Sequence, residues 1–272
     1  MRDDVELHTV WDVVDGVRVR GRVNVRALER VGVPHVVLVH GLGMATDYLE
    51  PTMRALGNEL AVSALDLPGF GGSRAVRRRR SLAELAEALI AWLRVRGIVA
   101  PILVGQSHGC QVVVEAVSRA PGVASALVLN APTTVAEHRT IGAQLWRVAV
   151  DTPREPLSLV PHVMRDYLRA GPVRILATLN DALHHRIEDK LPVVRVPVTI
   201  VNGARDPVSP PAWGERLARL TGTQSSSSPA AFVVVPGAAH AVPFSHPAAL
   251  AAEVTVMARR LGTVTASRTR GS

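Results

Sequence analysis

The chain has 272 residues, a length that suits one large α/β domain or two smaller ones. Hydrophobic residues make up 47% and charged residues 20%, which excludes a disordered chain. The net charge is +8, but aromatic residues reach only 3% and no nucleic-acid-binding motif occurs, so no nucleic-acid partner is expected.

Two rare residue types narrow the chemistry. Lys190 is the only lysine and has no glycine-rich loop beside it, which excludes a P-loop nucleotide site, and its charged setting argues against a pyridoxal Schiff base. Cys110 is the only cysteine, so an intramolecular disulfide or a CxxC metal site is excluded. With neither a signal-peptide pattern nor a run of membrane-spanning length, the sequence predicts a cytoplasmic protein without a membrane partner.

The first predicted elements are strands. After the turn Asp15-Gly16, arginines alternate with Val17, Val19 and Val23, which predicts an antiparallel hairpin with one solvent-facing side. Six continuous apolar runs follow, and such runs are typical of parallel strands covered on both faces. They are residues 36–39, 62–65, 102–104, 126–129, 198–201 and 232–235.

Helical patterns separate these runs. Ser81 and Glu84 form a capping box before a helix that ends at Gly97, and further helices are predicted from 110 to about 119 and from 247 to about 261. Residues 132–192 carry helical pattern without a strand, which is far longer than an ordinary connection. We therefore expect a core of residues 1–131 and 193–262, a helical lid at 132–192, a loop at 225–228 and a flexible tail at 263–272.

A nucleophile motif lies between the third apolar run and the helix after it. Gly105-Gln106-Ser107-His108-Gly109 matches G-x-S-x-G in the strand-turn-helix context that a nucleophile elbow requires. The small residues permit a turn tight enough to expose the serine hydroxyl above the sheet. This placement favours Ser107 as a nucleophile over a chance match.

A serine nucleophile needs a base and an acid that orients the base. His240 follows the last strand at the carboxyl edge of the predicted sheet, whereas the start of the last helix suffices to explain His246. Asp206 follows the strand at 198–201, and we prefer it to Asp66, which precedes a Leu-Pro-Gly turn. The chain order serine, aspartate, histidine is the order expected for groups on successive strand ends.

Backbone N–H groups are needed to stabilise the oxyanion of a tetrahedral intermediate. The N–H of His108 is free at a helix N-terminus, and the loop His40-Gly41-Leu42-Gly43 can supply the N–H of Leu42. Taken alone, His40-Gly41 is equally consistent with an ordinary turn at a strand exit.

Together these motifs resemble the α/β-hydrolase superfamily over about residues 10–262. The match includes the loops at 40–43 and 66–73, the elbow, Asp206 and His240. The resemblance implies an eight-stranded, mostly parallel sheet with helices on both faces, a lid after the sixth strand, and a Ser-His-Asp triad. Relatives similar to dehalogenases and epoxide hydrolases carry aspartate at the elbow, so Ser107 argues against those activities. His108 departs from the usual Met or Leu, and its side chain either lines the pocket or faces the lid.

We therefore expect a serine hydrolase that cleaves a small, largely apolar ester or related acyl substrate without a cofactor or metal. The apolar content of the lid predicts an uncharged acyl or aryl group. Two alternatives stay open: a carbon–carbon bond hydrolase of a vinylogous diketone, and a non-hydrolytic ligand-binding member of the fold. The candidate pocket residues are His40, Gly41, Trp146, Met164 and Val242.

Overall fold

A computed structural model describes residues 5–24, 33–74, 76, 78–221 and 230–269, with side chains up to residue 262. The predicted loop at 225–228 lies outside the described residues. The structure contains each strand and helix that the sequence predicts, with bounds that differ from the expected ones by a few residues.

One eight-stranded sheet forms the centre of the molecule, in the order β1-β2-β4-β3-β5-β6-β7-β8. The first two strands form the predicted antiparallel hairpin, and β2 also pairs antiparallel with β4, whereas β3 to β8 are mutually parallel. The mostly parallel architecture expected from the continuous apolar runs is thus confirmed. The strands are β1 His8–Val14, β2 Val17–Val23, β3 His35–Val39, β4 Ala61–Leu65, β5 Ile102–Gln106, β6 Ala126–Asn130, β7 Val198–Gly203 and β8 Ala231–Val235.

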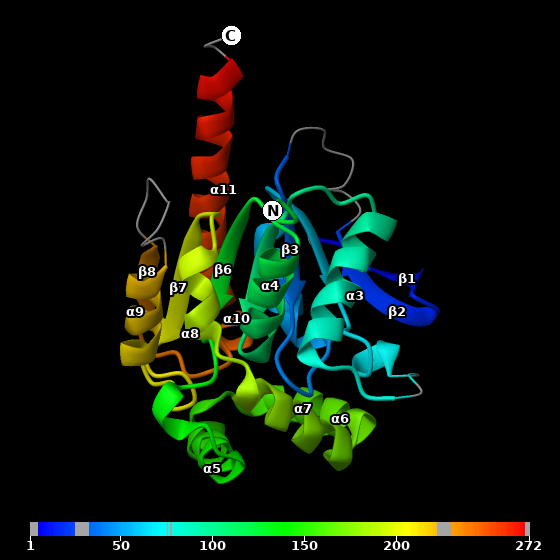
Figure 1. The fold of residues 1–272 in the computed structure, drawn as a ribbon, viewed down its shortest axis with the longest axis vertical. Coiled ribbons are helices and arrows are strands. Elements are labelled where there is room, and N and C mark those ends of the chain that lie inside the picture. Colours follow the sequence, from blue (N-terminus) through cyan, green and yellow to red (C-terminus); the bar gives the residue numbers. More distant parts are fainter. Residues whose placement is uncertain (1–4, 25–32, 75, 77, 222–229, 270–272) are drawn as a thin grey trace.

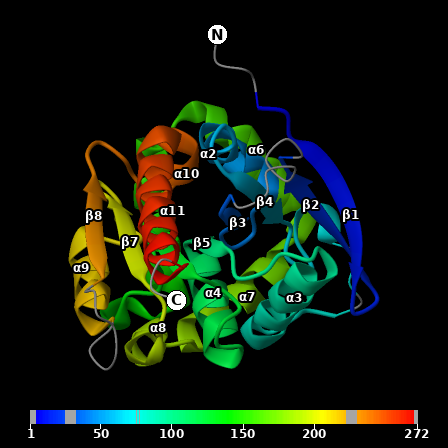
Figure 2. The ribbon, with the colours of Figure 1, turned by 90° about the horizontal axis from the view of Figure 1, so that it is seen from above.

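Helices cover both faces of the sheet (Figure 2). One face packs against α3 (Leu82–Val95), α4 (His108–Arg119), α8 (Ile187–Lys190) and α9 (Pro211–Leu220). The other face packs against α2 (Glu50–Leu56), α10 (Val242–Ser245) and α11 (Pro247–Thr269), and short 3-10 segments lie at Thr46–Leu49 and Gly71–Ser73. Because both faces are covered, the central strands β4 to β7 are buried along their whole length, which explains why they lack polar alternation.

The last helix is longer than predicted. It passes through Gly262 and reaches Thr269, so the flexible tail expected from residue 263 is wrong for most of that segment, while residues 270–272 lie outside the described part. A glycine lowers helix propensity by about 1 kcal/mol but does not stop a helix that contains no proline beyond its first residue. Figure 1 shows α11 projecting beyond the sheet on the side away from α5, α6 and α7.

A helical insertion, residues 132–192, connects β6 to β7. Its helices α5, α6 and α7 cover the carboxyl edge of the parallel strands, at the bottom of Figure 1. A charged cluster ties it to the core: Glu115 on α4 accepts hydrogen bonds from Lys190 Nζ at 2.6 Å and His185 Nε2 at 3.2 Å. The insertion contains α5 (Ile141–Asp151), α6 (Val160–Ala170), α7 (Pro172–His184) and α8, with 3-10 segments at Ala136–His138, Thr152–Arg154, Leu157–Leu159 and Leu191–Val193.

Candidate active site

The backbone at Ser107 is a strained turn between β5 and α4. Ser107 has φ 55° and ψ −119°, a conformation that a residue with a Cβ adopts only when its surroundings hold it. The flanking glycines are required by close packing, since a Cβ at Gly109 would lie 2.3 Å from the carbonyl oxygen of Val39, and one at Gly105 would lie 2.7 Å from the Cα of Cys110. The glycines of the G-x-S-x-G motif are therefore needed because neighbouring backbone atoms leave no room for a side chain at either position.

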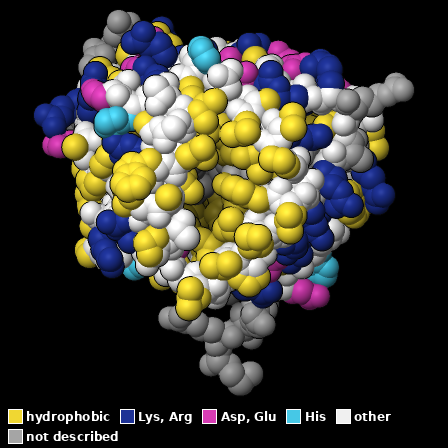
Figure 3. All heavy atoms as spheres, turned by 90° about the horizontal axis from the view of Figure 1, so that it is seen from below, with side chains coloured by type: hydrophobic (Ala, Val, Ile, Leu, Met, Phe, Trp, Pro, Cys, Tyr) yellow, Lys and Arg dark blue, Asp and Glu magenta, His cyan; other side chains and the backbone are white. Residues whose placement is uncertain are grey.

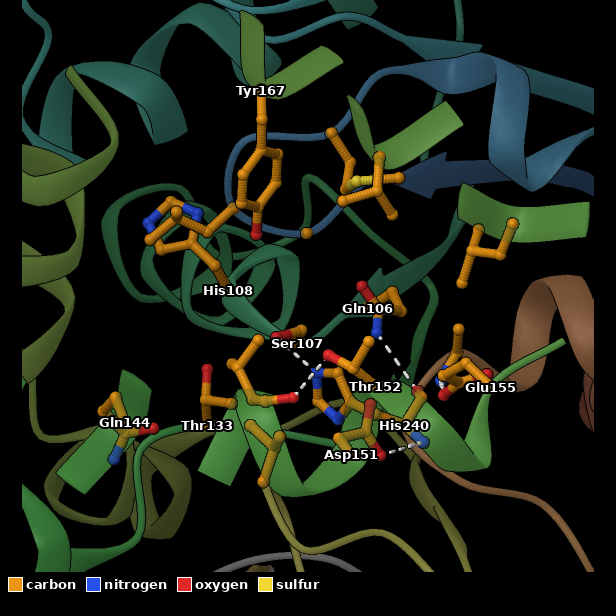
Figure 4. A pocket seen from close by; sticks show the side chains of 18 of the residues that line it. Gln106, Ser107, His108, Thr133, Gln144, Asp151, Thr152, Glu155, Tyr167 and His240 are labelled. Carbon is orange, nitrogen blue, oxygen red and sulfur yellow. Dashed lines mark hydrogen bonds between the residues drawn. The ribbon is translucent and has the colours of Figure 1, made fainter. Parts of the chain in front are cut away.

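Ser107, His240 and Asp206 lie in one chain of hydrogen bonds. His240 Nε2 is 2.9 Å from Ser107 Oγ, and His240 Nδ1 is 2.8 Å from Asp206 Oδ2 (Figure 4 shows the contact with the serine). Asp206 is 3% exposed, and its Oδ1 accepts hydrogen bonds from the N–H groups of Val208 at 2.7 Å and Ser209 at 2.8 Å. The carboxylate is thus fixed and orients the imidazole.

The electrostatics of His240 favour its protonated form. Burial lowers the pKa of His240, but the attraction and hydrogen bond of Asp206, with further attraction from Asp151 and Glu155, outweigh burial and raise the pKa to about 9. An imidazole in this setting accepts a proton readily.

Asp66 and His246, the alternatives to Asp206 and His240, have other hydrogen-bond partners in the structure. Asp66 accepts hydrogen bonds from the N–H groups of Thr46 and Gly72, both at 2.7 Å, and contacts Arg20, so it holds a turn. His246 Nδ1 bonds to Ser245 Oγ at 3.0 Å at the end of α10. Neither contacts Ser107.

The expected oxyanion donors flank the serine. Leu42 and His108 both line the cavity above Ser107, and no described residue accepts a hydrogen bond from either backbone N–H. The loop that carries Leu42 passes close to the elbow, because a Cβ at Gly41 would lie 2.4 Å from Gln106 Oε1 and 3.3 Å from the Cβ of Ser107. Gly41 is therefore needed for this approach.

A cavity of about 340 Å³ opens above Ser107 between the sheet edge and the helical insertion. Figure 3 shows its mouth as a hollow surrounded by hydrophobic side chains. Of the predicted pocket residues, Gly41 and Met164 line it. Twelve more of the lining residues have aliphatic or methionine side chains: Leu42, Met44, Leu145, Val148, Leu159, Val160, Val163, Ile175, Leu179, Ala182, Val208 and Ala241.

Three predicted pocket residues do not line the cavity. His40 is fully buried behind the loop, where its Nε2 accepts a hydrogen bond from Leu67 N–H at 2.9 Å. Trp146 is 70% exposed, because the cavity-facing side of α5 carries Gln144, Leu145, Val148 and Asp151 and the helical phase turns Trp146 outward. Val242 is the first residue of α10, and its side chain is buried in the core on that face of the sheet.

The side chain of His108 lies in the cavity wall. It is 2% exposed, its Nε2 has no hydrogen-bond partner among the described residues, and burial together with nearby His40 and His185 lowers its pKa to about 3. His108 is therefore a neutral polar group that faces the cavity.

A polar relay that the sequence analysis missed supports the histidine loop. Tyr48 Oη accepts a hydrogen bond from Gly41 N–H at 3.1 Å and donates to Gln106 Oε1 at 2.7 Å, and Gln106 Nε2 donates to the carbonyl oxygen of His240 at 3.3 Å. The relay connects the Leu42 loop, the elbow and His240. No motif in the sequence marks Tyr48, although Gln106 lies inside the elbow motif.

Two carboxyl groups of the insertion were also missed, Asp151 and Glu155. Asp151 Oδ1 accepts a hydrogen bond from His240 N–H at 3.3 Å, and Glu155 Oε1 accepts one from Ala241 N–H at 2.6 Å (Figure 4). Burial, followed by the charges of Glu155 and Asp206, raises the pKa of Asp151 to about 7 against the opposing attraction of His240. Burial likewise raises the pKa of Glu155. Asp151 ends α5, and Glu155 follows a 3-10 segment in extended conformation, so no helical spacing marks the pair in the sequence.

Cys110, next to the elbow, is buried and inert. Its Sγ lies 3.1 Å from the carbonyl oxygen of Gly105 and 3.2 Å from that of Asn130, and burial raises the pKa of the thiol. Within the described residues, no group of three or more His, Cys, Asp or Glu side chains is arranged to hold a metal ion. No helix in the described part of the chain is long and apolar enough to cross a membrane.

The chain is similar in sequence and in fold to known hydrolases. Residues 36–253 match the model of the alpha/beta hydrolase family. A pimeloyl-[acyl-carrier protein] methyl ester esterase of Methylococcus capsulatus is 31% identical over 214 residues, covering 69% of this chain and 82% of that protein. A protein of the same name from Neisseria meningitidis serogroup B is 28% identical over 258 residues, covering 84% and 95%. The structure of a thermophilic esterase from Thermogutta terrifontis superposes with a TM-score of 0.74 at 21% identity, covering 94% and 99%, which shows a shared fold.

Proposed function

Because this chain belongs to the α/β-hydrolase family and is a hydrolase of that fold, we propose that it cleaves a small, largely apolar ester through an acyl-enzyme on Ser107. The observation that carries the proposal is the continuous hydrogen-bond chain from Ser107 through His240 to Asp206 at the floor of an apolar cavity. The two relatives named as methyl ester esterases support an ester as the substrate.

In the acylation step, Ser107 Oγ attacks the ester carbonyl carbon while His240 Nε2 removes its proton. Asp206 accepts the hydrogen bond of His240 Nδ1–H, so Nε2 is the nitrogen of the neutral imidazole that takes the serine proton, and the carboxylate stabilises the imidazolium that forms. The imidazolium then donates its proton to the departing alkoxide oxygen, which leaves as the alcohol.

The negative oxygen of the tetrahedral intermediate would accept hydrogen bonds from the backbone N–H groups of Leu42 and His108. Because described residues do not occupy these donors, they are available without rearrangement. In the deacylation step, His240 activates a water molecule that attacks the acyl carbon, and the carboxylic acid product leaves with Ser107 regenerated.

Size and polarity of the cavity support a small, mostly hydrocarbon substrate. A volume of about 340 Å³ lies at the lower end of ordinary ligand pockets, and its wall consists largely of Leu, Val, Ile and Met side chains. The lid-like position of the helical insertion above the cavity would exclude bulk water from the acyl-enzyme.

The test is a comparison of Ser107→Ala with Ser118→Ala. Ser118 lies near the end of α4, outside the cavity lining, and its Oγ donates to the carbonyl oxygen of Val114. We expect Ser107→Ala to lower turnover of a p-nitrophenyl ester by roughly 10⁵-fold and to abolish labelling by a fluorophosphonate, with an unchanged circular dichroism spectrum. Ser118→Ala should keep both properties. Full activity of Ser107→Ala would refute the proposal, and faster cleavage of vinylogous diketones than of esters by the wild type would assign carbon–carbon hydrolysis instead.

A further inference from the structure

More carboxyl groups surround His240 than the proposed reaction requires. Asp206 alone orients the imidazole, yet Asp151 and Glu155 also lie beside His240 in the cavity wall. When all three carboxyl groups are ionised, one imidazolium compensates only one of them in a largely apolar cavity. Buried carboxyl groups in this position therefore need either a proton or a cation beside them.

No arginine or lysine supplies that cation. Among the described residues, neither Asp151 nor Glu155 forms an ion pair with a basic side chain, although the insertion is rich in arginine. The nearest arginines along the chain, Arg147 and Arg154, donate instead to the carbonyl oxygens of Pro207 and Val150.

Other buried or half-buried carboxylates of the molecule are compensated. Asp47 is paired with both Arg20 and Arg165, and Glu188 is paired with Arg139. In a chain of net charge +8, the absence of a partner at this one carboxyl pair is therefore a property of the cavity and does not reflect a shortage of arginine.

The pair also has unused binding capacity. Each carboxyl accepts one backbone hydrogen bond through a single oxygen, and Glu155 Oε2 is buried without a partner in the described structure. Asp151 is 7% exposed and lines the cavity, and its raised pKa means that a proton can take the place of the missing cation.

We propose that Asp151 and Glu155 form a subsite for a positively charged alkylammonium group of the substrate. The inference rests on the proposed ester hydrolysis and deepens it by naming a substrate class: an ester whose acyl or alcohol part carries an amine. The hydrogen bonds to the N–H groups of His240 and Ala241 place this charge beside the reacting carbonyl. It amends the expectation of a wholly uncharged substrate.

An alkylammonium fits the surroundings of the pair. The neighbouring wall contains Val148, Leu159 and Val160, and these apolar side chains suit the methyl and methylene groups of an organic cation. Within the described residues, the pair is not part of a group of three or more His, Cys, Asp or Glu side chains arranged to hold a metal ion.

Matched esters that differ only by a nitrogen-to-carbon exchange test the charge alone. The first pair is choline butyrate and 3,3-dimethylbutyl butyrate, which places the charge on the alcohol side. The second pair is the p-nitrophenyl esters of 4-(trimethylammonio)butanoate and 5,5-dimethylhexanoate, which places it on the acyl side. We expect kcat/KM to favour the cationic member of at least one pair by about tenfold or more at pH 8, because opposite charges a few ångströms apart in a partly buried site attract strongly.

The variant is the double substitution Asp151→Asn and Glu155→Gln. Each amide keeps an oxygen that can accept the backbone hydrogen bond, so the substitutions remove charge while the supports of His240 and Ala241 stay in place. Glu137→Gln is the matched control, because it removes one negative charge from an exposed site on the same insertion.

The preference for the cation should fall to about threefold or less in the double variant and persist in Glu137→Gln. Equal kcat/KM values within both pairs for the wild type, or an undiminished preference in the double variant, would overturn the inference.

Binding to Ser107→Ala separates this inference from the proposed reaction. Calorimetry with choline and its neutral counterpart 3,3-dimethylbutan-1-ol needs no turnover. If no ester is hydrolysed, tighter binding of choline that is lost on adding the double substitution would uphold the subsite while the proposed reaction falls. Equal binding of the two alcohols would overturn the subsite.

Discussion

The carboxyl edge of the sheet and the helical insertion that covers it differ in how tightly their residues are packed. At the sheet edge, Ser107, Asp206 and His240 follow the parallel strands β5, β7 and β8, and backbone contacts closer than a Cβ permits surround the elbow. In the insertion, α5 and α6 carry hydrophobic side chains that are half or more exposed, such as Leu145 and Met164. The sheet edge holds the proposed catalytic groups in fixed positions, and the insertion forms much of the cavity wall that a substrate would contact.

This difference separates reactivity from selectivity along the chain. The groups proposed to transfer protons are fixed by the sheet, whereas the two uncompensated carboxyl groups come from the insertion. Substitutions at the edge are therefore expected to change rates or stability steeply, and substitutions in the insertion should change them less.

The largest expected effect is at the acid of the proposed triad. Asp206→Asn should lower kcat by roughly 10⁴-fold, because an amide no longer holds His240 in the tautomer that accepts the serine proton. The matched control is Asp66→Asn, which should lower the melting temperature through the loss of the bond network with Arg20 and the Thr46 and Gly72 N–H groups while retaining most of kcat. Steady-state kinetics on folded protein checks both, and the reverse order of losses in kcat would assign the acid to Asp66.

Paired glycine substitutions test the packing difference directly. Gly109→Ala should destabilise the protein by about 3 kcal/mol or more, because its Cβ would lie 2.3 Å from the carbonyl oxygen of Val39, a backbone atom that cannot move aside. Gly142→Ala in α5 has no atom within 4 Å of the new Cβ and should stabilise by roughly 0.5–1 kcal/mol through helix propensity. Denaturant unfolding measures both, and equal effects would remove the distinction between the regions.

The smallest expected effect concerns pH and the insertion. The pKa of Asp151 is raised from its ordinary value of 3.8 to about 7, so between these two pH values the folded state holds a proton that the unfolded state has lost, and stability falls as pH rises through this window. Asp151→Asn lacks this loss and should be more stable than wild type at pH 8 by about 2 kcal/mol, with little gain at pH 4. The gain stays below the ~4 kcal/mol that such a raised pKa costs in isolation, because the substitution also removes attraction to protonated His240.

Thermal unfolding at the two pH values measures the Asp151 effect. A loss of stability at pH 8 would show that the hydrogen bond from His240 N–H outweighs the buried charge.

The sequence was sufficient for the sheet edge because its signals are local. Continuous apolar runs mark the parallel strands, and polar residues directly after them converge in space by topology alone, which is how Asp206 and His240 could be chosen from many candidates. The strained turn at Ser107 likewise has a short motif, since only glycines fit on either side of it.

The cavity wall could not be predicted as well, because it depends on how helices rotate and pack. Trp146 was chosen for its residue type, but the phase of α5 turns it outward and turns Asp151 inward. Asp151 and Glu155 flank Thr-Pro-Arg in the sequence and resemble a polar surface turn; only the tertiary contact with the His240 loop gives them a role.

The sealed thiol of Cys110 has a practical consequence. The only cysteine of the chain is 0% exposed and its sulfur lies against two backbone carbonyl oxygens, so thiol-reactive labels have no native target on the folded protein. A single cysteine introduced on the outer side of α5, for example at Trp146, would therefore carry a spectroscopic label without first replacing a native residue. Such a label would report in solution whether the insertion moves over the cavity.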